Sequence, residues 1–296
     1  MLLRQLISQG VLTISQSYPE TEAREMVFAC LEHILGTRRH THIVEPEYAV
    51  DDDGVKKALD AFSRMACGEP LQYVTGQAFF YGRSFHVTSD TLIPRPETEL
   101  LCRMAVDSMR AAGKQSPRIL DMCTGSGCIA WTLALELPRS SVVAVDLSEG
   151  ALAVASSQSF AEEKALTGAS SPQFFKADIL RSAEESGLES LSARFDLILS
   201  NPPYVMDSEK SLMRSNVLDH EPHMALFVPD SDPLVFYRAV ASWGQKQLSP
   251  DGVGIVEINE ALGNETADVF RQAGFSRVSV EKDLYDKDRF VRFSRC

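Results

Sequence analysis

The chain has 296 residues, of which 44% are hydrophobic and 24% charged, a balance typical of a folded globular protein and not of a disordered or collagen-like one. Its 29 basic and 41 acidic residues give a formal net charge of -12, which disfavours an extended nucleic acid as a partner. The six cysteines contain no C-x-x-C pair, and no apolar stretch reaches membrane-span length. We therefore expect a cytoplasmic protein with reduced thiols and without a membrane as a partner.

Residues 1–75 are expected to form a small all-helical domain. Apolar residues recur there at three- and four-residue spacings, most clearly over 26–35 and 55–65. Three aspartates at 51–53 precede the second stretch, where carboxylates cap a helix and favour its positive end. Metal binding is the alternative for this acidic cluster, and the cap is the preferred interpretation.

Residues 76–92 are expected to form a β-hairpin that links this domain to the rest of the chain. Aromatic and β-branched residues dominate the segment, and Gly76 and Gly82 punctuate it. Pro94 and Pro96 follow and stiffen an extended entry, and Pro96 is suited to the first turn of a helix.

Residues 93–296 are expected to form an α/β domain with a doubly wound, mostly parallel, Rossmann-like sheet. Short apolar runs alternate there with helical patterns, which is typical of strands joined by crossover helices. The expected strands are 118–122, 142–146, 174–178, 195–200, 254–258, 276–281 and 289–294, and the expected helices lie near 128–137, 149–164, 233–247 and 262–273. In such a fold the ligand lies at the carboxyl ends of the strands, near the switch point in strand order.

A glycine-rich turn follows the first of these strands. Gly125, Gly127 and Ala130 fit the loose fingerprint of a dinucleotide site, because glycines let the backbone approach a ligand before a helix begins. Asp146 ends the next strand, where an acidic residue accepts hydrogen bonds from ribose hydroxyls. The pattern favours a ribose-containing cofactor, with a purely structural turn as the alternative.

Asp121 distinguishes between the possible cofactors. It ends the strand four residues before the first glycine, where its carboxylate would repel the pyrophosphate of a dinucleotide. S-adenosylmethionine carries an ammonium and a sulfonium in that region instead. On this interpretation Asp121 lies near the amino-acid end of the cofactor, and Asp178 with Ile179 borders the adenine. A helix cap at the strand end is the alternative for Asp178.

Asn201-Pro202-Pro203-Tyr204 is the most specific signal in the chain. It follows directly after an apolar strand, and two successive prolines fix the loop and the direction of its carbonyl groups. The Asn201 side-chain oxygen and the Pro202 carbonyl are suited to accept both hydrogens of a planar NH2 group, with Tyr204 as a flat wall behind it. A strand-terminating turn is the alternative.

This arrangement suits methyl transfer to an amide or an aromatic amine. The lone pair of such a nitrogen is delocalised, so hydrogen bonds from both N–H groups favour the transition state in which the nitrogen becomes positive.

His220 and His223 have the spacing of a metal pair, but Pro222 breaks the helix that would put them on one face. We therefore expect no metal.

The sequence resembles the protein-(glutamine-N5) methyltransferases of peptide chain release factors, the HemK/PrmC type. The resemblance covers nearly the whole chain and rests on 68–76, 92–99, 121–127, 201–204 and 221–226 together. Asn-Pro-Pro-Tyr alone is shared with adenine-N6 methyltransferases, so the combination carries the assignment.

The resemblance implies transfer of a methyl group from S-adenosylmethionine to the glutamine of the Gly-Gly-Gln motif in bacterial class I release factors. It places the cofactor loop on Cys123, Thr124, Gly125, Ser126 and Gly127. It also implies that Asp146, Ile179 and Asn201 contact the cofactor, and that Asn201, Pro202, Pro203 and Tyr204 form the substrate-amide loop. Cys123 stands where many relatives have glycine. We expect the helical domain to help dock the release factor.

Three other functions are the alternatives. An adenine-N6 nucleic-acid methyltransferase would use the same loop, but the negative charge disfavours it. An NAD-dependent dehydrogenase is disfavoured by Asp121, and a non-enzymatic binding module by the intact Asn201 loop.

Overall fold

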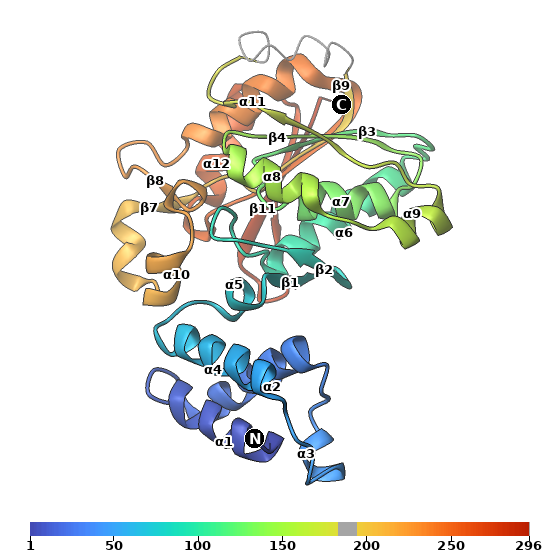
Figure 1. The fold of residues 1–296 in the computed structure, drawn as a ribbon. Coiled ribbons are helices and arrows are strands. Elements are labelled where there is room, and N and C mark those ends of the chain that lie inside the picture. The colour runs from blue at the N-terminus through green and yellow to red at the C-terminus, as the bar shows by residue number, and fades with distance from the viewer. Residues whose placement is uncertain (183–193, 296) are drawn as a thin grey trace. The chain divides into compact units, whose positions relative to one another are not determined.

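The computed structural model describes residues 1–182 and 194–295 (Figure 1). The chain divides into two compact units, the first formed by Met1–Gln77 with Met213–Glu221 and the second by Ala78–Leu212 with Pro222–Cys296. Among the described residues, no helix is both long and apolar enough to span a bilayer.

The first unit is helical, as the apolar spacing predicts. Its helices are α1 (Leu3–Ile14), α2 (Glu20–Leu35), α3 (Thr41–Val44), α4 (Asp52–Ala66), α5 (Leu71–Thr75) and α10 (Ser215–His220). Apolar side chains from α1, α2 and α4 form a core that includes the fully buried Phe62. The Asp51 side chain accepts a hydrogen bond from the backbone N–H of Gly54 at 2.7 Å, which confirms the predicted helix cap.

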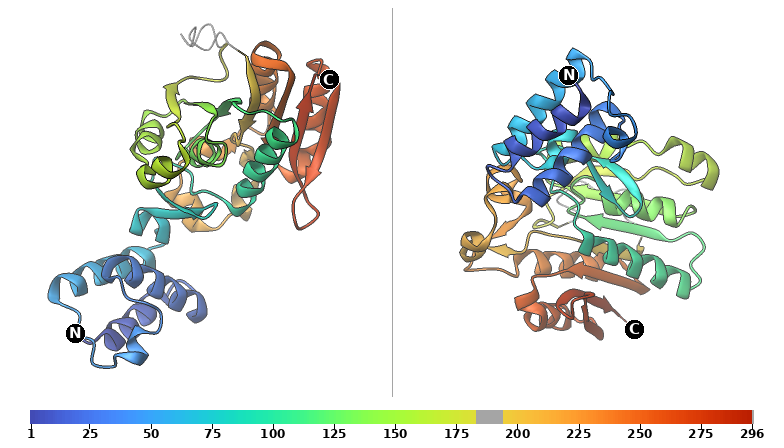
Figure 2. Two further views of the ribbon diagram at one scale, coloured as in Figure 1. Left: turned by 90° about the vertical axis from the view of Figure 1, so that its right-hand side faces the viewer. Right: turned by 90° about the horizontal axis from the view of Figure 1, so that it is seen from below.

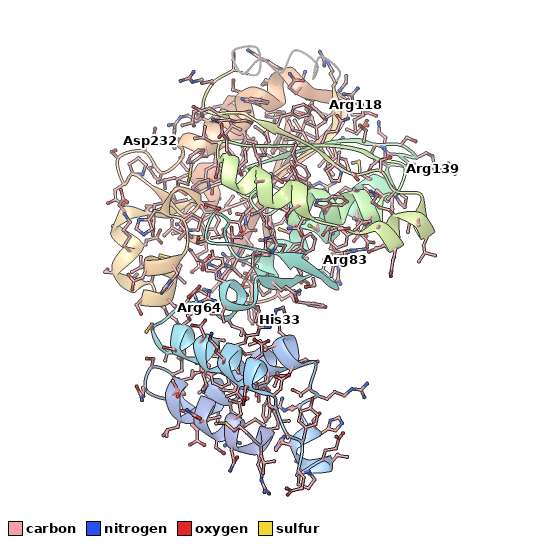
Figure 3. The ribbon with its side chains drawn as sticks, in the orientation of Figure 1. His33, Arg64, Arg83, Arg118, Arg139 and Asp232 are labelled. Atoms are coloured by element: carbon pink, nitrogen blue, oxygen red, sulfur yellow. The ribbon has the colours of Figure 1, made fainter. Side chains whose placement is uncertain are left out.

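The expected hairpin begins the second unit. Its strands β1 (Gln77–Phe80) and β2 (Arg83–His86) pair through a turn in which both Tyr81 and Gly82 have positive φ angles, of 49° and 76°. Arg83, labelled in Figure 3, forms ion pairs with Glu136 and Glu163. These pairs join the hairpin to the two helices that contain these glutamates.

The second unit is built on a seven-stranded sheet with the order β10-β11-β9-β6-β3-β4-β5. The strands are β3 (Arg118–Met122), β4 (Ser141–Asp146), β5 (Gln173–Lys176), β6 (Phe195–Ser200), β9 (Leu248–Glu257), β10 (Arg277–Lys282) and β11 (Asp288–Ser294). The pairs β9–β6, β6–β3, β3–β4 and β4–β5 are parallel, and β11 is antiparallel to both neighbours. The predicted doubly wound, mostly parallel sheet is therefore confirmed.

Helices cover both faces of this sheet (Figure 2). The core on one face contains α6 (Pro96–Ala111) and α7 (Cys128–Glu136), and the core on the other contains α11 (Val235–Gln247) and α12 (Gly263–Gln272). Successive side chains of a strand point to opposite faces, so Leu197 and Leu199 join the first core while Ile198 joins the second. The centre of the sheet is consequently packed on both faces.

The expected single helix near 149–164 is wrong, because the structure divides it into α8 (Glu149–Ser157) and α9 (Ala161–Thr167). Gln158 between them is extended, with ψ at 137°. Its side-chain amide donates to the carbonyls of His86 and Ser126, at 2.8 and 3.1 Å, and its oxygen accepts from the N–H of His86. Tertiary hydrogen bonds at Gln158 thus override the local helical pattern.

The segment between β6 and α11 contains short elements that the sequence analysis did not anticipate. They are β7 (Val205–Met206), the 3-10 helix η2 (Asp207–Leu212), η3 (His223–Ala225) and β8 (Phe227–Val228), and a further turn, η4 (Glu260–Leu262), follows β9. Elements of two to six residues are too short to show a hydrophobic period, so apolar spacing does not reveal them.

Candidate active site

The candidate site lies at the carboxyl ends of the parallel strands. β3 is followed in sequence by β4 on one side, whereas β6 pairs on the other side, so the strand order reverses beside β3. The glycine loop follows β3 and Asn201 follows β6, which places both motifs at this switch point.

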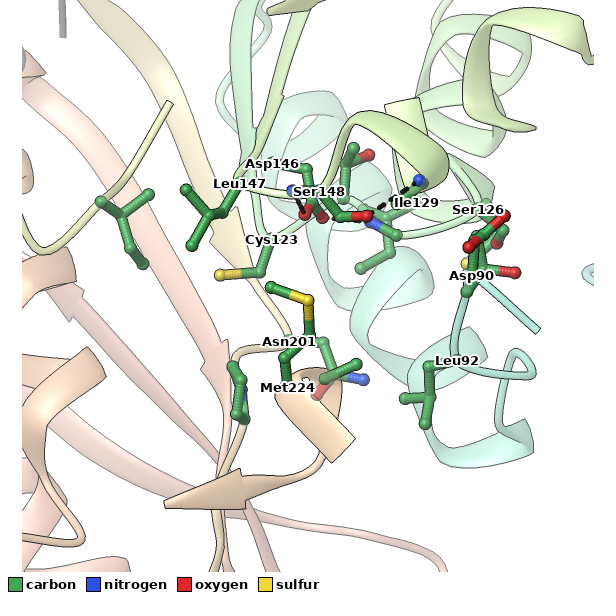
Figure 4. A pocket seen from close by; sticks show the side chains of 18 of the residues that line it. Asp90, Leu92, Cys123, Ser126, Ile129, Asp146, Leu147, Ser148, Asn201 and Met224 are labelled. Carbon is green, nitrogen blue, oxygen red and sulfur yellow. Dashed lines mark hydrogen bonds between the residues drawn. The ribbon is translucent and has the colours of Figure 1, made fainter. Parts of the chain in front are cut away.

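A pocket opens at this edge of the sheet, lined by the ends of β3, β4 and β6, by the segment before α6, and by η3 and α11. Figure 4 shows Cys123, Asp146 and Ser148 at one side of it and Asn201 with Met224 at another. The lining residues are Asp90, Thr91, Leu92, Pro94, Arg95, Thr98, Cys123, Thr124, Gly125, Ser126, Cys128, Ile129, Asp146, Leu147, Ser148, Ala151, Ala177, Asp178, Ile179, Leu180, Asn201, Pro203, Met224, Ala225 and Phe236.

The glycine loop reaches its shape through three positive φ angles, of 62° at Cys123, 55° at Gly125 and 78° at Gly127. Glycine adopts this conformation freely, but a side chain at Cys123 is strained there. A Cβ at Gly125 would meet no atom within 4 Å, whereas one at Gly127 would lie 3.0 Å from the Cβ of Ala155. Gly125 therefore leaves open space beside the pocket, and Gly127 permits close packing against α8.

Asp146 connects the loop to the end of β4. Its carboxylate accepts hydrogen bonds from the backbone N–H groups of Gly125 and Ser148, at 2.8 and 2.9 Å. Burial raises the pKa of Asp146, and these backbone hydrogen bonds oppose the rise. Each carboxylate oxygen has a second lone pair, so Asp146 retains acceptors for hydroxyl groups in the pocket.

The chemistry of the lining fits S-adenosylmethionine. Asp90, Asp146 and Asp178 line the pocket against a single arginine, Arg95, which favours a positively charged ligand over a pyrophosphate. Leu147, Leu180 and Met224 add apolar surface that is about half exposed, at 48%, 51% and 54%, and suits a flat ring.

Asp121 lies beneath the loop. Its side chain is fully buried, does not line the pocket, and accepts a hydrogen bond from the Thr124 hydroxyl at 2.6 Å. Burial raises its pKa from 3.8 to about 7, and the Thr124 hydrogen bond partly opposes this. Asp121 thus supports the loop from inside, and direct contact with a cofactor stays a prediction.

The Asn201 loop is held by hydrogen bonds from its side chains. Asn201 Nδ2 donates to the Thr98 hydroxyl at 3.1 Å, and this hydroxyl donates to Glu257 at 2.8 Å. The Tyr204 hydroxyl also donates to Glu257, at 3.0 Å. Within the described part of the chain, Asn201 Oδ1 accepts no hydrogen bond and remains available to a ligand.

The pocket brings together most of the residues predicted from sequence. Cys123, Thr124, Gly125, Ser126, Asp146, Asp178, Ile179, Asn201 and Pro203 line it, whereas Asp121, Gly127, Pro202 and Tyr204 lie outside its lining. The pocket is also lined by Asp90 and Arg95, which precede α6, and by Thr98 in its first turn, and none of the three had a predicted site role. The paired prolines of this segment were the available signal, because they indicated a rigid strand-to-helix entry beside the site.

The sheet and its glycine loop define the class of the protein as a methyltransferase that uses S-adenosylmethionine. Residues 98–222 match the family model of the methyltransferase small domain, and residues 5–76 match that of the PrmC N-terminal domain. A release factor glutamine methyltransferase of Flavobacterium psychrophilum is 35% identical over 99% of both chains, and one of Bacteroides thetaiotaomicron is 41% identical over 78% of both. The chain belongs to the release factor glutamine methyltransferase family.

A comparison with solved structures agrees at the level of the fold. The hMettl16 catalytic domain, solved in complex with the MAT2A 3'UTR hairpin 6, superposes with a TM-score of 0.54 at 14% identity and covers 83% of each chain. As a member of the release factor glutamine methyltransferase family, the chain is an enzyme with S-adenosylmethionine as its cofactor.

We expect Asp146→Ala to weaken cofactor binding. Charge-assisted hydrogen bonds contribute about 1.5 to 3 kcal/mol, so the Kd for S-adenosylmethionine should rise roughly 10- to 150-fold in calorimetric titration. Glu149→Ala is the matched control, because this acidic residue is exposed and lies outside the pocket lining. An unchanged Kd for Asp146→Ala would contradict the role of this carboxylate.

We expect Asp121 to make stability fall with rising pH. Its pKa is 3.8 in ordinary surroundings and about 7 in the fold, so over this interval the folded state holds a proton that the unfolded chain has released. Each pH unit then removes at most about 1.4 kcal/mol from the free energy of unfolding. Denaturant titrations from pH 4 to pH 8 should show Asp121→Asn gaining on the wild type as pH rises, and parallel curves would refute the assignment.

Proposed function

We propose that the enzyme methylates the side-chain nitrogen N5 of the glutamine in the Gly-Gly-Gln motif of bacterial class I peptide chain release factors, in the cytoplasm. The observation that carries the proposal is the Asn201 side chain, whose oxygen is left free at the pocket by the hydrogen bond from Nδ2 to Thr98. The relatives are release factor glutamine methyltransferases, which supports the choice of substrate.

The loop after β3 and the acidic residue at the end of β4 are the proposed cofactor contacts. The backbone of Cys123–Gly127 approaches the amino-acid end, Asp146 accepts from the ribose hydroxyls, and Asp178 with Ile179 borders the adenine. When bound, S-adenosylmethionine supplies a methyl group on a positively charged sulfur, which leaves as a neutral thioether.

The Asn201 loop is the proposed substrate contact. Asn201 Oδ1 accepts one hydrogen of the glutamine amide and the Pro202 carbonyl accepts the other. Pro203, which lines the pocket, and Tyr204, which lies behind the lining, complete the wall. These acceptors stabilise the amide nitrogen as it pyramidalises and gains positive charge. The nitrogen forms its bond to the methyl carbon as the carbon–sulfur bond breaks, and it then releases one proton to water.

We expect Asn201→Ala to lose methyl transfer and to keep cofactor binding. Loss of one preorganised hydrogen-bonding group typically lowers kcat by about 10²- to 10³-fold, because the interaction is strongest in the transition state. Mass spectrometry of a purified release factor, incubated with enzyme and S-adenosylmethionine, should show one added methyl group on the Gly-Gly-Gln peptide with the wild type only.

Two outcomes would contradict the proposal. Full activity of Asn201→Ala would remove the assigned role of its side chain. Transfer to an adenine-containing oligonucleotide, with none to the release factor, would favour an adenine-N6 methyltransferase instead.

We further propose that the helical first unit docks the release factor. It has a hydrophobic core of its own and holds none of the pocket-lining residues. Deletion of 1–75 should spare kcat/KM on a short Gly-Gly-Gln peptide and lower it at least about tenfold on the intact factor, because the lost contacts act on the factor's remote surface. Cooperative melting and cofactor titration establish that the truncated protein is folded, and equal losses on both substrates would exclude the docking role.

A further inference from the structure

One buried carboxylate holds both ends of the Asn201 loop. Glu257, at the end of β9, is 1% exposed, and its two oxygens accept hydrogen bonds from the hydroxyls of Thr98 and Tyr204. Tyr204 ends the loop, and Thr98 reaches its first residue, Asn201. The proposed substrate loop is therefore tied at each end to a strand that carries no residue of the pocket lining.

The direction of these hydrogen bonds determines which atom Asn201 presents to the pocket. An ionised carboxylate only accepts, so the Thr98 hydroxyl must donate its single hydrogen to Glu257. This hydroxyl is then an acceptor toward Asn201, which must offer its NH2 group rather than its oxygen. Asn201 Oδ1 is thereby left as the acceptor at the pocket.

Burial shields this network from water, and the hydrogen bonds that Glu257 accepts favour its ionised form. Thr98 is 2% exposed and Glu257 is 1% exposed, so water does not compete freely for the Thr98 hydroxyl or the Glu257 carboxylate. Burial raises the pKa of Glu257, and the hydrogen bonds from Thr98 and Tyr204 oppose the rise. Burial and the Glu257 charge raise the pKa of Tyr204 well above its ordinary value, so this phenol keeps its proton and donates.

We propose that Glu257 and Thr98 are positioning residues that fix the Asn201 side-chain amide with its oxygen toward the substrate. The inference rests on the proposed function, in which this oxygen accepts a hydrogen of the glutamine amide. A reversed Asn201 would present its own N–H groups to the substrate N–H groups and would oppose the reaction.

The test uses the full chain and a pair of substitutions at Thr98. Thr98→Val keeps the shape and removes the hydroxyl, and it should lower kcat about 10- to 100-fold, the scale of a misplaced catalytic group. Thr98→Ser keeps the hydroxyl, and its kcat should stay within about threefold of the wild type, because the hydrogen bonds of this hydroxyl are retained. The Kd for S-adenosylmethionine should change little in both variants.

Thr266→Val is the matched control. Thr266 is fully buried in α12, and its hydroxyl has no hydrogen-bond partner among the residues that the structure describes. Its replacement removes a buried hydroxyl without touching the Asn201 network, so kcat should stay at the wild-type value. Glu257→Leu gives a second test, because it removes both acceptor oxygens and leaves the hydrogen of the Thr98 hydroxyl uncommitted, so kcat should fall as in Thr98→Val.

A readout independent of activity separates this inference from the proposed function. The side-chain NH2 of Asn201, observed by NMR in the 15N-labelled protein, should shift and exchange faster with water in Thr98→Val but not in Thr98→Ser. Wild-type kcat or unshifted Asn201 signals in Thr98→Val, or equal losses in the Val and Ser variants, would overturn the positioning role. Absence of methyl transfer by the wild type would overturn the proposed function, while the NMR comparison would still test the orientation.

Discussion

Parallel pairing of β3 with β4 and β6 is the constraint on which the site depends. The register aligns Met122 with both Val145 and Ser200, so the residues that follow each strand emerge at the same edge. Cys123 and Asn201 directly follow β3 and β6, and Asp146, the residue after Val145, is the last residue of β4. A one-residue slip of any strand would exchange its buried faces, so the two hydrophobic cores that fix the register also fix the distance between the glycine loop and Asn201.

Two different devices keep the loops at this edge in shape. The glycine loop relies on its backbone conformation. Asp146 accepts a hydrogen bond from the N–H of Gly125, and Asp121 is buried beneath the loop. The Asn201 loop relies on prolines for its backbone and on the Glu257 carboxylate for its side chains. The first device allows a ligand to approach the main chain, and the second gives a single side-chain atom a defined direction.

The sequence predicted the elements that position the site but not the contacts that orient its side chains. β3 and β6 have the expected bounds, because a buried parallel strand is a continuous apolar run with sharp ends. The break at Gln158 was missed because it depends on His86, which is far away in the sequence. Thr98 and Glu257 were missed for the same reason, since a threonine in a helix and a glutamate in an apolar strand carry no local sign that they meet.

Recognition of an NH2 group does not by itself choose between a glutamine amide and an adenine. Both are planar nitrogens that offer two hydrogens, and Asn201 Oδ1 with the Pro202 carbonyl would accept from either. Discrimination must therefore come from the surroundings of that nitrogen. An adenine arrives on a phosphate backbone, which meets a chain of net charge -12 and a pocket lined by Asp90, Asp146 and Asp178. A glutamine on a protein loop brings no such charge, so the same electrostatics that favour a cationic cofactor also favour an amide substrate.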